Sequence, residues 1–122
     1  MGRKWQECNS QIGDHDYEQT YRSIIPIFEN ILEKYNFTNI IFYNGDADII
    51  CDFMQTHKVL IDKLKLPLKE PSKPWFYDGQ PAGLGYKFLN GIKYYTVIDA
   101  GHYVPTHKPK QAIAILEELL SN

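Results

Sequence analysis

The residues best suited to chemistry are one histidine and two aspartates, on turns that follow predicted strands. His102 comes after a β-rich run at residues 94–98, and Asp46 and Asp48 come after an apolar run at residues 39–43. Histidine titrates near neutrality and so suits proton transfer, and a carboxylate can hold an imidazole in one orientation. A loop histidine that only satisfies a hydrogen bond is an equally good interpretation of the local pattern.

Other chemistries fit these residues less well. A calcium-binding loop needs a third oxygen ligand where the sequence has Ile50, and no glutamate closes such a loop. His102 and His107 lie five residues apart in a proline-containing loop, which is not a typical zinc spacing, and a zinc site that uses Cys51 is a weak alternative. We therefore expect no metal and no cofactor.

Two segments carry a family resemblance. Residues 100–105 read Ala-Gly-His-Tyr-Val-Pro and precede a Lys-Pro pair, and residues 43–48 read Tyr-Asn-Gly-Asp-Ala-Asp. Together they resemble the histidine and aspartate motifs of the serine carboxypeptidases, the α/β-hydrolase family that includes lysosomal cathepsin A and yeast carboxypeptidase Y. Three positions depart from the usual motif: Asp99 stands where glycine is common, Tyr103 where methionine is common, and His107 where aspartate is common.

The resemblance implies a role for each motif residue. His102 is the general base of a Ser-Asp-His triad, Asp48 is the acid that orients it, and Asp46 is structural. Cys51 and Tyr103 match positions beside the active site and are weaker candidates for the substrate pocket. Cys8 matches a family cysteine that bridges to the amino-terminal part of the enzyme, so we expect it to pair outside this chain or to stay free.

The nucleophile of such an enzyme is not found in this sequence. No serine lies in a Gly-x-Ser-x-Gly sequence; the serines are Ser10, Ser23, Ser72 and Ser121. By resemblance, the chain is the carboxyl-terminal portion of a serine carboxypeptidase, a single partial catalytic domain over residues 1–122. Its expected function is release of carboxy-terminal residues from peptides, once the amino-terminal portion or chain of the enzyme is supplied. The alternative is a non-catalytic truncated chain or pseudoenzyme that acts as a binding module.

Composition excludes several partners. The 122 residues are 43% hydrophobic with a net charge of −2, so neither disorder nor nucleic-acid binding is indicated. No apolar run is long enough to span a membrane, so we expect no membrane partner. Asn36 begins an N-glycosylation sequon. With the resemblance, the sequon favours a lysosomal or secreted (extracellular) location.

The expected fold class is α/β, as the carboxyl-terminal part of an α/β-hydrolase fold: a buried strand, flanking helices, a β-hairpin and a terminal helix. Residues 1–15 are expected to be irregular. The expected helices are 24–35, 51–64 and 109–120, and the expected strands are 39–43, 75–77, 82–89 and 92–98. The strand at 39–43 shows no alternation and is predicted to be buried on both faces of a parallel sheet. Residues 65–74, with three prolines, are predicted to form a loop.

Overall fold

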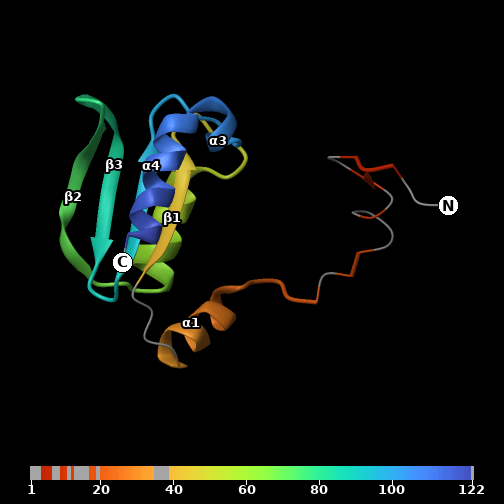
Figure 1. Cartoon of the computed structure of the whole chain (residues 1–122). Helices are drawn as coiled ribbons and strands as arrows, with labels where there is room; N and C mark the ends of the chain where they lie inside the picture. Colours follow the sequence, from red (N-terminus) through yellow and green to blue (C-terminus); the bar gives the residue numbers. More distant parts are fainter. Residues whose placement is uncertain are drawn as a thin grey trace.

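The computed structural model describes residues 4–6, 9–10, 12, 17–18, 20–34 and 39–121. Within these residues the chain forms one four-stranded sheet with helices packed on both faces (Figure 1). The elements are α1 (Ile25–Lys34), β1 (Ile40–Gly45), α2 (Phe53–Lys58), the π-helix η2 (Val59–Lys63), β2 (Leu68–Tyr77), β3 (Gln80–Phe88), β4 (Ile92–Val97), α3 (Val104–His107) and α4 (Pro109–Leu120). The mixed α/β content agrees with the sequence prediction.

The sheet has the strand order β1-β4-β3-β2. The strands β2, β3 and β4 form an antiparallel meander, because each follows the last through a tight turn. Asp78 and Gly79 both have positive φ in the two-residue turn between β2 and β3, as a type I′ hairpin requires, and Gly91 has positive φ in the three-residue turn between β3 and β4. The strand β1 instead pairs in parallel with β4, from Ile40 opposite Ile92 to Gly45 opposite Val97.

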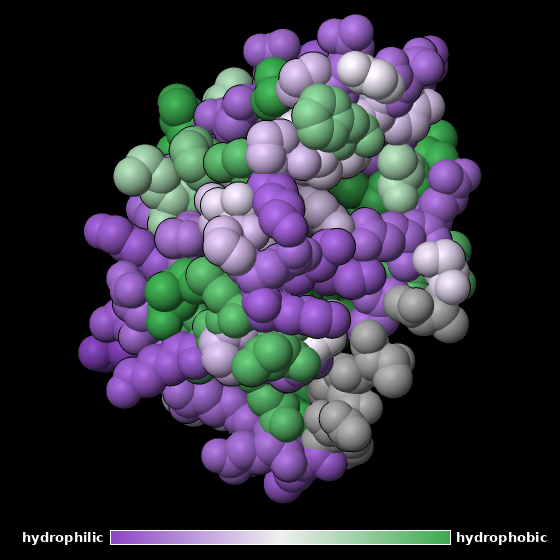
Figure 2. Space-filling view, turned by 90° about the vertical axis from the view of Figure 1, so that its left-hand side faces the viewer, coloured by the Kyte–Doolittle hydropathy of each residue, from purple (hydrophilic) through white to green (hydrophobic). Residues whose placement is uncertain are grey.

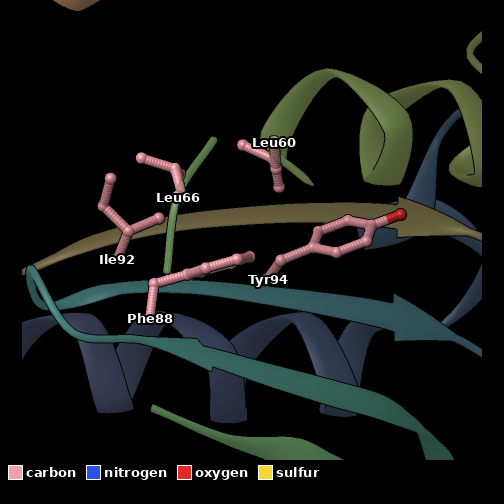
Figure 3. Packing of buried hydrophobic residues seen from close by; sticks show 5 residues of the cluster. All are labelled: Leu60, Leu66, Phe88, Ile92 and Tyr94. Carbon is pink, nitrogen blue, oxygen red and sulfur yellow. The ribbon is translucent and has the colours of Figure 1, made fainter. Parts of the chain in front are cut away.

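The core lies on both sides of β4. One set of its side chains, including Ile92 and Tyr94, packs with Leu60 of η2, Leu66 and Phe88 (Figure 3). The alternate set, Tyr95 and Val97, packs on the other face with Ala100, Val104 and Ile115. The central strand is therefore buried by helix α4 on one face and by α2 and η2 on the other.

The structure corrects the prediction that the strand at 39–43 is buried on both faces. β1 lies at an edge of the sheet, and its residues are half-buried except Gly45, which is buried, and Tyr43, which is exposed. The most buried strand is β4. The apolar run at residues 39–43 predicted the strand and its parallel pairing. Its burial depends on what lies next to it in the sheet, and no described residue pairs with the outer edge of β1.

The structure also corrects the predicted loop at residues 65–74. Most of it belongs to β2, which passes through Pro71 and Pro74 with irregular register. Proline lacks a backbone N–H, but β2 is the other edge strand, where outward groups need no partner. A second correction is α3, a short helix inside the predicted histidine loop, with Pro105 in its first turn.

The remaining helices agree with the sequence. The predicted helix at 51–64 is found as α2 and η2, and Asp52 caps it by accepting a hydrogen bond from Met54 N–H. Helix α4 has the predicted bounds. None of the helices in the described part of the chain has the length and apolar character of a membrane span.

Candidate active site

The two candidate motifs meet at one end of the sheet. β1 and β4 are parallel neighbours, so the turns that follow them leave the same end of the sheet. One turn begins at Asp46, and the other, which we call the histidine turn, begins at Ile98. The carboxyl ends of parallel strands are where α/β proteins place their ligands and catalytic groups. Residues 54 positions apart, Asp48 and His102, are thereby brought into contact.

The contact joins the carboxylate of Asp48 to the imidazole of His102. Asp48 Oδ2 lies 3.1 Å from His102 Nδ1. The Asp48 side chain is 4% exposed, whereas that of His102 is 46% exposed. With Nδ1 protonated and bonded to Asp48, the second ring nitrogen, Nε2, carries the free lone pair. The pair therefore has the arrangement of an orienting acid and an accessible base.

The turn around Asp48 holds its carboxylate in the ionised form. Burial by itself raises the pKa of Asp48, but the backbone N–H of Ile50, the His102 ring and the N–H of Cys51 all donate hydrogen bonds to it. These bonds and the charge of His102 together bring the pKa of Asp48 below its ordinary value of 3.8. A carboxylate fixed by two amides cannot rotate freely, so it fixes the ring as well.

Gly45 allows the two turns to approach closely. A Cβ placed on Gly45 would lie 2.0 Å from Ala100 O and 2.6 Å from Gly101 O. The same closeness permits two backbone bonds between the turns, from Asp46 N–H to Val97 O and from Ala47 N–H to Ala100 O, both 3.0 Å long. Only glycine fits this position, and the geometry of the Asp48–His102 pair depends on it.

Asp46 has the structural position that the sequence predicted. Its Oδ1 accepts a 2.8 Å hydrogen bond from the backbone N–H of Asp99, in the histidine turn. Asp99 has a φ of 56°, in the left-handed region that favours glycine and tolerates aspartate. This backbone requirement explains why glycine suits the position. The Asp99 side chain adds a 3.6 Å ion pair with Lys108, whereas its bond to Asp46 uses the backbone N–H that any non-proline residue would supply.

Sequence reasoning gave His107 no role, but the structure places it against the histidine turn. Its Nδ1 accepts a 2.9 Å hydrogen bond from the backbone N–H of Gly101, the residue before His102. A Cβ on Gly101 would lie 3.0 Å from the His107 ring, so the two residues are closely packed. His107 is the last residue of α3, from which its ring reaches back to the turn. The sequence held no signal for this contact, because residues 104–107 were predicted to be part of a loop rather than a helix.

The two weaker pocket candidates both lie beside the pair. The Tyr103 ring stands edge-on to the His102 ring, with 5.2 Å between their centroids. Cys51 is exposed with a free thiol, and it lines an apolar groove formed by β1, α1 and α2. Its sulfur, an Asp48 carboxylate oxygen and a His102 ring nitrogen lie within 4.8 Å of one another, so these three residues could hold a metal ion.

The two other predicted sites, Cys8 and Asn36, lie outside the described residues.

A histidine held by a buried carboxylate, at the ends of adjacent parallel strands, is the arrangement of the acid and base in α/β enzymes that use a triad. Comparison with known proteins agrees with this class. The family model described as serine carboxypeptidase matches residues 2–122. The chain belongs to the serine carboxypeptidase family.

Individual relatives cover the chain almost completely. It is 31% identical to serine carboxypeptidase ctsa-4.1 of Caenorhabditis elegans, over 97% of this chain and 26% of the relative. It is 31% identical to serine carboxypeptidase-like 29 of Arabidopsis thaliana, over 97% of this chain and 24% of the relative. It is 29% identical to the lysosomal protective protein of Mus musculus, over 97% of this chain and 25% of the relative. The chain thus spans about a quarter of the length of these curated relatives.

Proposed function

We propose that this chain is the carboxyl-terminal portion of a serine carboxypeptidase and supplies the acid and base of its triad. The observation that carries the proposal is the 3.1 Å contact between Asp48 Oδ2 and His102 Nδ1. The chain's coverage of about a quarter of its relatives' lengths supports a further portion that carries the serine. The substrates are the carboxy-termini of peptides or proteins.

The chemistry follows from the two nitrogens of His102. The nucleophilic serine of the complementing portion gives its hydroxyl proton to Nε2 while its oxygen attacks the scissile carbonyl carbon. Asp48 accepts the Nδ1–H bond and stabilises the imidazolium that forms. The imidazolium then gives the proton to the leaving amine, and an acyl-serine ester remains. A water molecule, deprotonated by the same nitrogen, hydrolyses the ester and frees the serine.

The exposed surface around β1 supports the idea that a further portion of protein covers it. Beyond the groove that Cys51 lines, a second apolar groove lies between β1 and α4, and it includes the exposed side chains of Tyr43, Ile113 and Leu116. A strand edge flanked by two apolar grooves resembles the interior of a sheet rather than its border. We propose that a strand of the serine-bearing portion pairs with β1.

The opposite edge of the sheet has a different character. The side of the molecule on which β2 lies carries mostly hydrophilic side chains, with hydrophobic ones scattered among them (Figure 2). Along β2, Glu70 pairs with Lys73 and Lys87. Prolines and charges are how proteins protect a true edge strand from pairing. The contrast supports β2 as the outer border of the complete sheet and β1 as a strand inside it.

A reconstitution experiment tests the function. The chain alone, the chain co-expressed with a serine-bearing portion from a longer transcript or a relative, and that pair with His102→Ala are compared for release of the terminal residue from a blocked dipeptide. We expect activity only from the intact pair, because a base and its orienter cannot form an acyl-enzyme without a nucleophile. His57→Ala is the matched control, since its ring contacts Tyr86 away from the site.

Two outcomes would contradict the proposal. Turnover by the purified chain alone would show that it contains another nucleophile. A pair that co-purifies in folded form but releases no residue would favour the alternative, a pseudoenzyme chain that only binds.

We also propose a lysosomal or secreted location, supported by the Asn36 sequon and by the similarity to the lysosomal protective protein of Mus musculus. Expression in a secretory cell line tests it. Glycosidase treatment should increase the mobility of the chain, and Asn36→Gln should abolish that change. A chain that stays in the cytosol without glycan would contradict both expectations.

A further inference from the structure

The side chains around the candidate triad pair carry three different kinds of metal ligand. Asp48 offers a carboxylate oxygen, Cys51 a sulfur and His102 an imidazole nitrogen, with all three atoms within 4.8 Å of one another. No second group of three such residues comes together in the part of the chain that the structure describes. A sulfur, a nitrogen and an oxygen are the ligands that Zn²⁺ accepts, and three protein ligands leave its fourth tetrahedral position open.

Each residue is already suited to binding. The backbone N–H groups of Ile50 and Cys51 both donate to the carboxylate of Asp48 and so fix its orientation. The Cys51 thiol is exposed and takes part in no disulfide, so its sulfur is accessible to an ion from solvent. His102 is about half exposed, which gives an ion direct access from solvent. The buried carboxylate thus forms the floor of the site, and the other two ligands form its rim.

We propose that Asp48, Cys51 and His102 form a reversible binding site for Zn²⁺ or a similar divalent transition-metal ion. Binding forms a metal–sulfur bond as the thiol proton passes to solvent, and a metal–nitrogen bond through the lone pair of one imidazole nitrogen. No electron is transferred. The thiolate disfavours Ca²⁺ and Mg²⁺, which prefer oxygen ligands.

Metal binding and proton transfer at His102 exclude each other. If Nδ1 binds the ion, the hydrogen bond to Asp48 is lost; if Nε2 binds it, the lone pair that accepts the serine proton is taken. The metal-bound state is therefore inhibitory in any enzyme that uses this pair. That consequence rests on the proposed function, but metal binding by the chain itself does not.

Co²⁺ is the probe for the first experiment, because a cobalt–thiolate bond absorbs in the near ultraviolet and tetrahedral Co²⁺ absorbs strongly in the visible. The full 122-residue chain, fused to a carrier protein without cysteine, is titrated with Co²⁺, and Zn²⁺ is then added as competitor. We expect one equivalent of Co²⁺ to give both absorptions and Zn²⁺ to remove them. Losing even an outer hydrogen-bond partner of a metal ligand costs about 10- to 100-fold in affinity, so Cys51→Ser and His102→Ala should each weaken binding by at least about 100-fold.

Cys8→Ser is the matched control, because it removes the other thiol of the chain and should leave the affinity unchanged. The proposal is overturned if Cys8→Ser abolishes the absorption, if Cys51→Ser or His102→Ala retains full affinity, or if millimolar Co²⁺ gives no thiolate band. These results do not depend on peptidase activity, so they separate this proposal from the proposed function.

A second measurement covers the case in which a variant does not fold. In the unmodified sequence, Zn²⁺ should slow alkylation of Cys51 by iodoacetamide, as followed for each cysteine by peptide mass spectrometry, and Mg²⁺ at the same concentration should not. Equal protection by both ions, or protection of Cys8 rather than Cys51, would contradict the site.

Discussion

Replacing Gly45 by alanine should separate the two turns that carry the candidate catalytic pair. The new Cβ would lie 2.0 Å from Ala100 O, 2.4 Å from Ala100 C and 2.6 Å from Gly101 O. Carbon and oxygen atoms of this kind approach to about 3.3 Å, so the histidine turn must move by roughly 1.3 Å. Such a shift would carry His102 away from Asp48, whose contact is now 3.1 Å.

The cost follows from the contacts that the turn would lose. Overpacking by one methyl group costs about 1–3 kcal/mol. Losing the 3.0 Å bond from Ala47 N–H to Ala100 O adds about 0.5–1.5 kcal/mol, so the free energy of unfolding should fall by about 1.5–4.5 kcal/mol. In a completed enzyme, a displacement of about 1 Å at the reacting groups should lower turnover by about 10²-fold.

Two measurements on the chain test this reasoning. Urea unfolding gives the loss of stability, and the low-field NMR signal of the hydrogen-bonded His102 N–H reports the contact with Asp48. Gly79→Ala is the matched control: nothing lies within 4 Å of its Cβ, and its φ of 73° alone should cost about 1–2 kcal/mol. Both variants should lose stability, but only Gly45→Ala should lose the low-field signal. A Gly45→Ala chain that keeps the signal and its full stability would refute the close approach.

Four further predictions concern the Asp48–His102 pair, two buried tyrosines and Cys8. Asp48→Asn in the completed enzyme should lower turnover by about 10⁴-fold, as the equivalent change does in another triad enzyme, whereas Asp46→Asn should act mainly on stability. Steady-state kinetics measure both effects, and similar catalytic losses at the two positions would contradict the assignment of Asp48 as the acid. Because the pKa of Asp48 is lowered in the fold, its contribution to stability is present above its ordinary value of 3.8 and is lost as the pH falls further, so Asp48→Asn should flatten the acid end of a pH–stability profile. Burial, aided by the negative charges of neighbouring groups, raises the pKa values of Tyr94 and Tyr95, so both phenols stay neutral in the fold. Stability should therefore fall above about pH 10, where the tyrosines of the unfolded chain ionise. Phenylalanine at either position should reduce that fall in alkaline unfolding experiments. Cys8 should pair outside this chain or stay free, and non-reducing peptide mapping that finds the two cysteines of this chain joined would contradict this.

Much of the fold could be predicted because local patterns agree with it. Two such patterns are the apolar spacing of the last helix and the apolar run before Asp46. Each indicates one local structure, and both are found. The prolines at residues 65–74 were misleading, because proline excludes a central strand but not an edge strand. Whether a strand lies at the edge depends on the rest of the sheet, which no local pattern contains.

The sequence by itself indicated the family, because residue types at fixed spacings form its two motifs. The prediction that Asp48 rather than Asp46 is the acid came from the family resemblance. Only the tertiary structure decided that the Asp48 carboxylate reaches His102, that His107 supports the histidine turn, and that Cys51 lies close enough to share a metal ion with the pair. The physical reason is the parallel pairing of β1 with β4. This pairing brings residues 54 positions apart into contact, and Gly45 permits the close approach of the two turns that carry them. The order of residues in the sequence does not encode such distances.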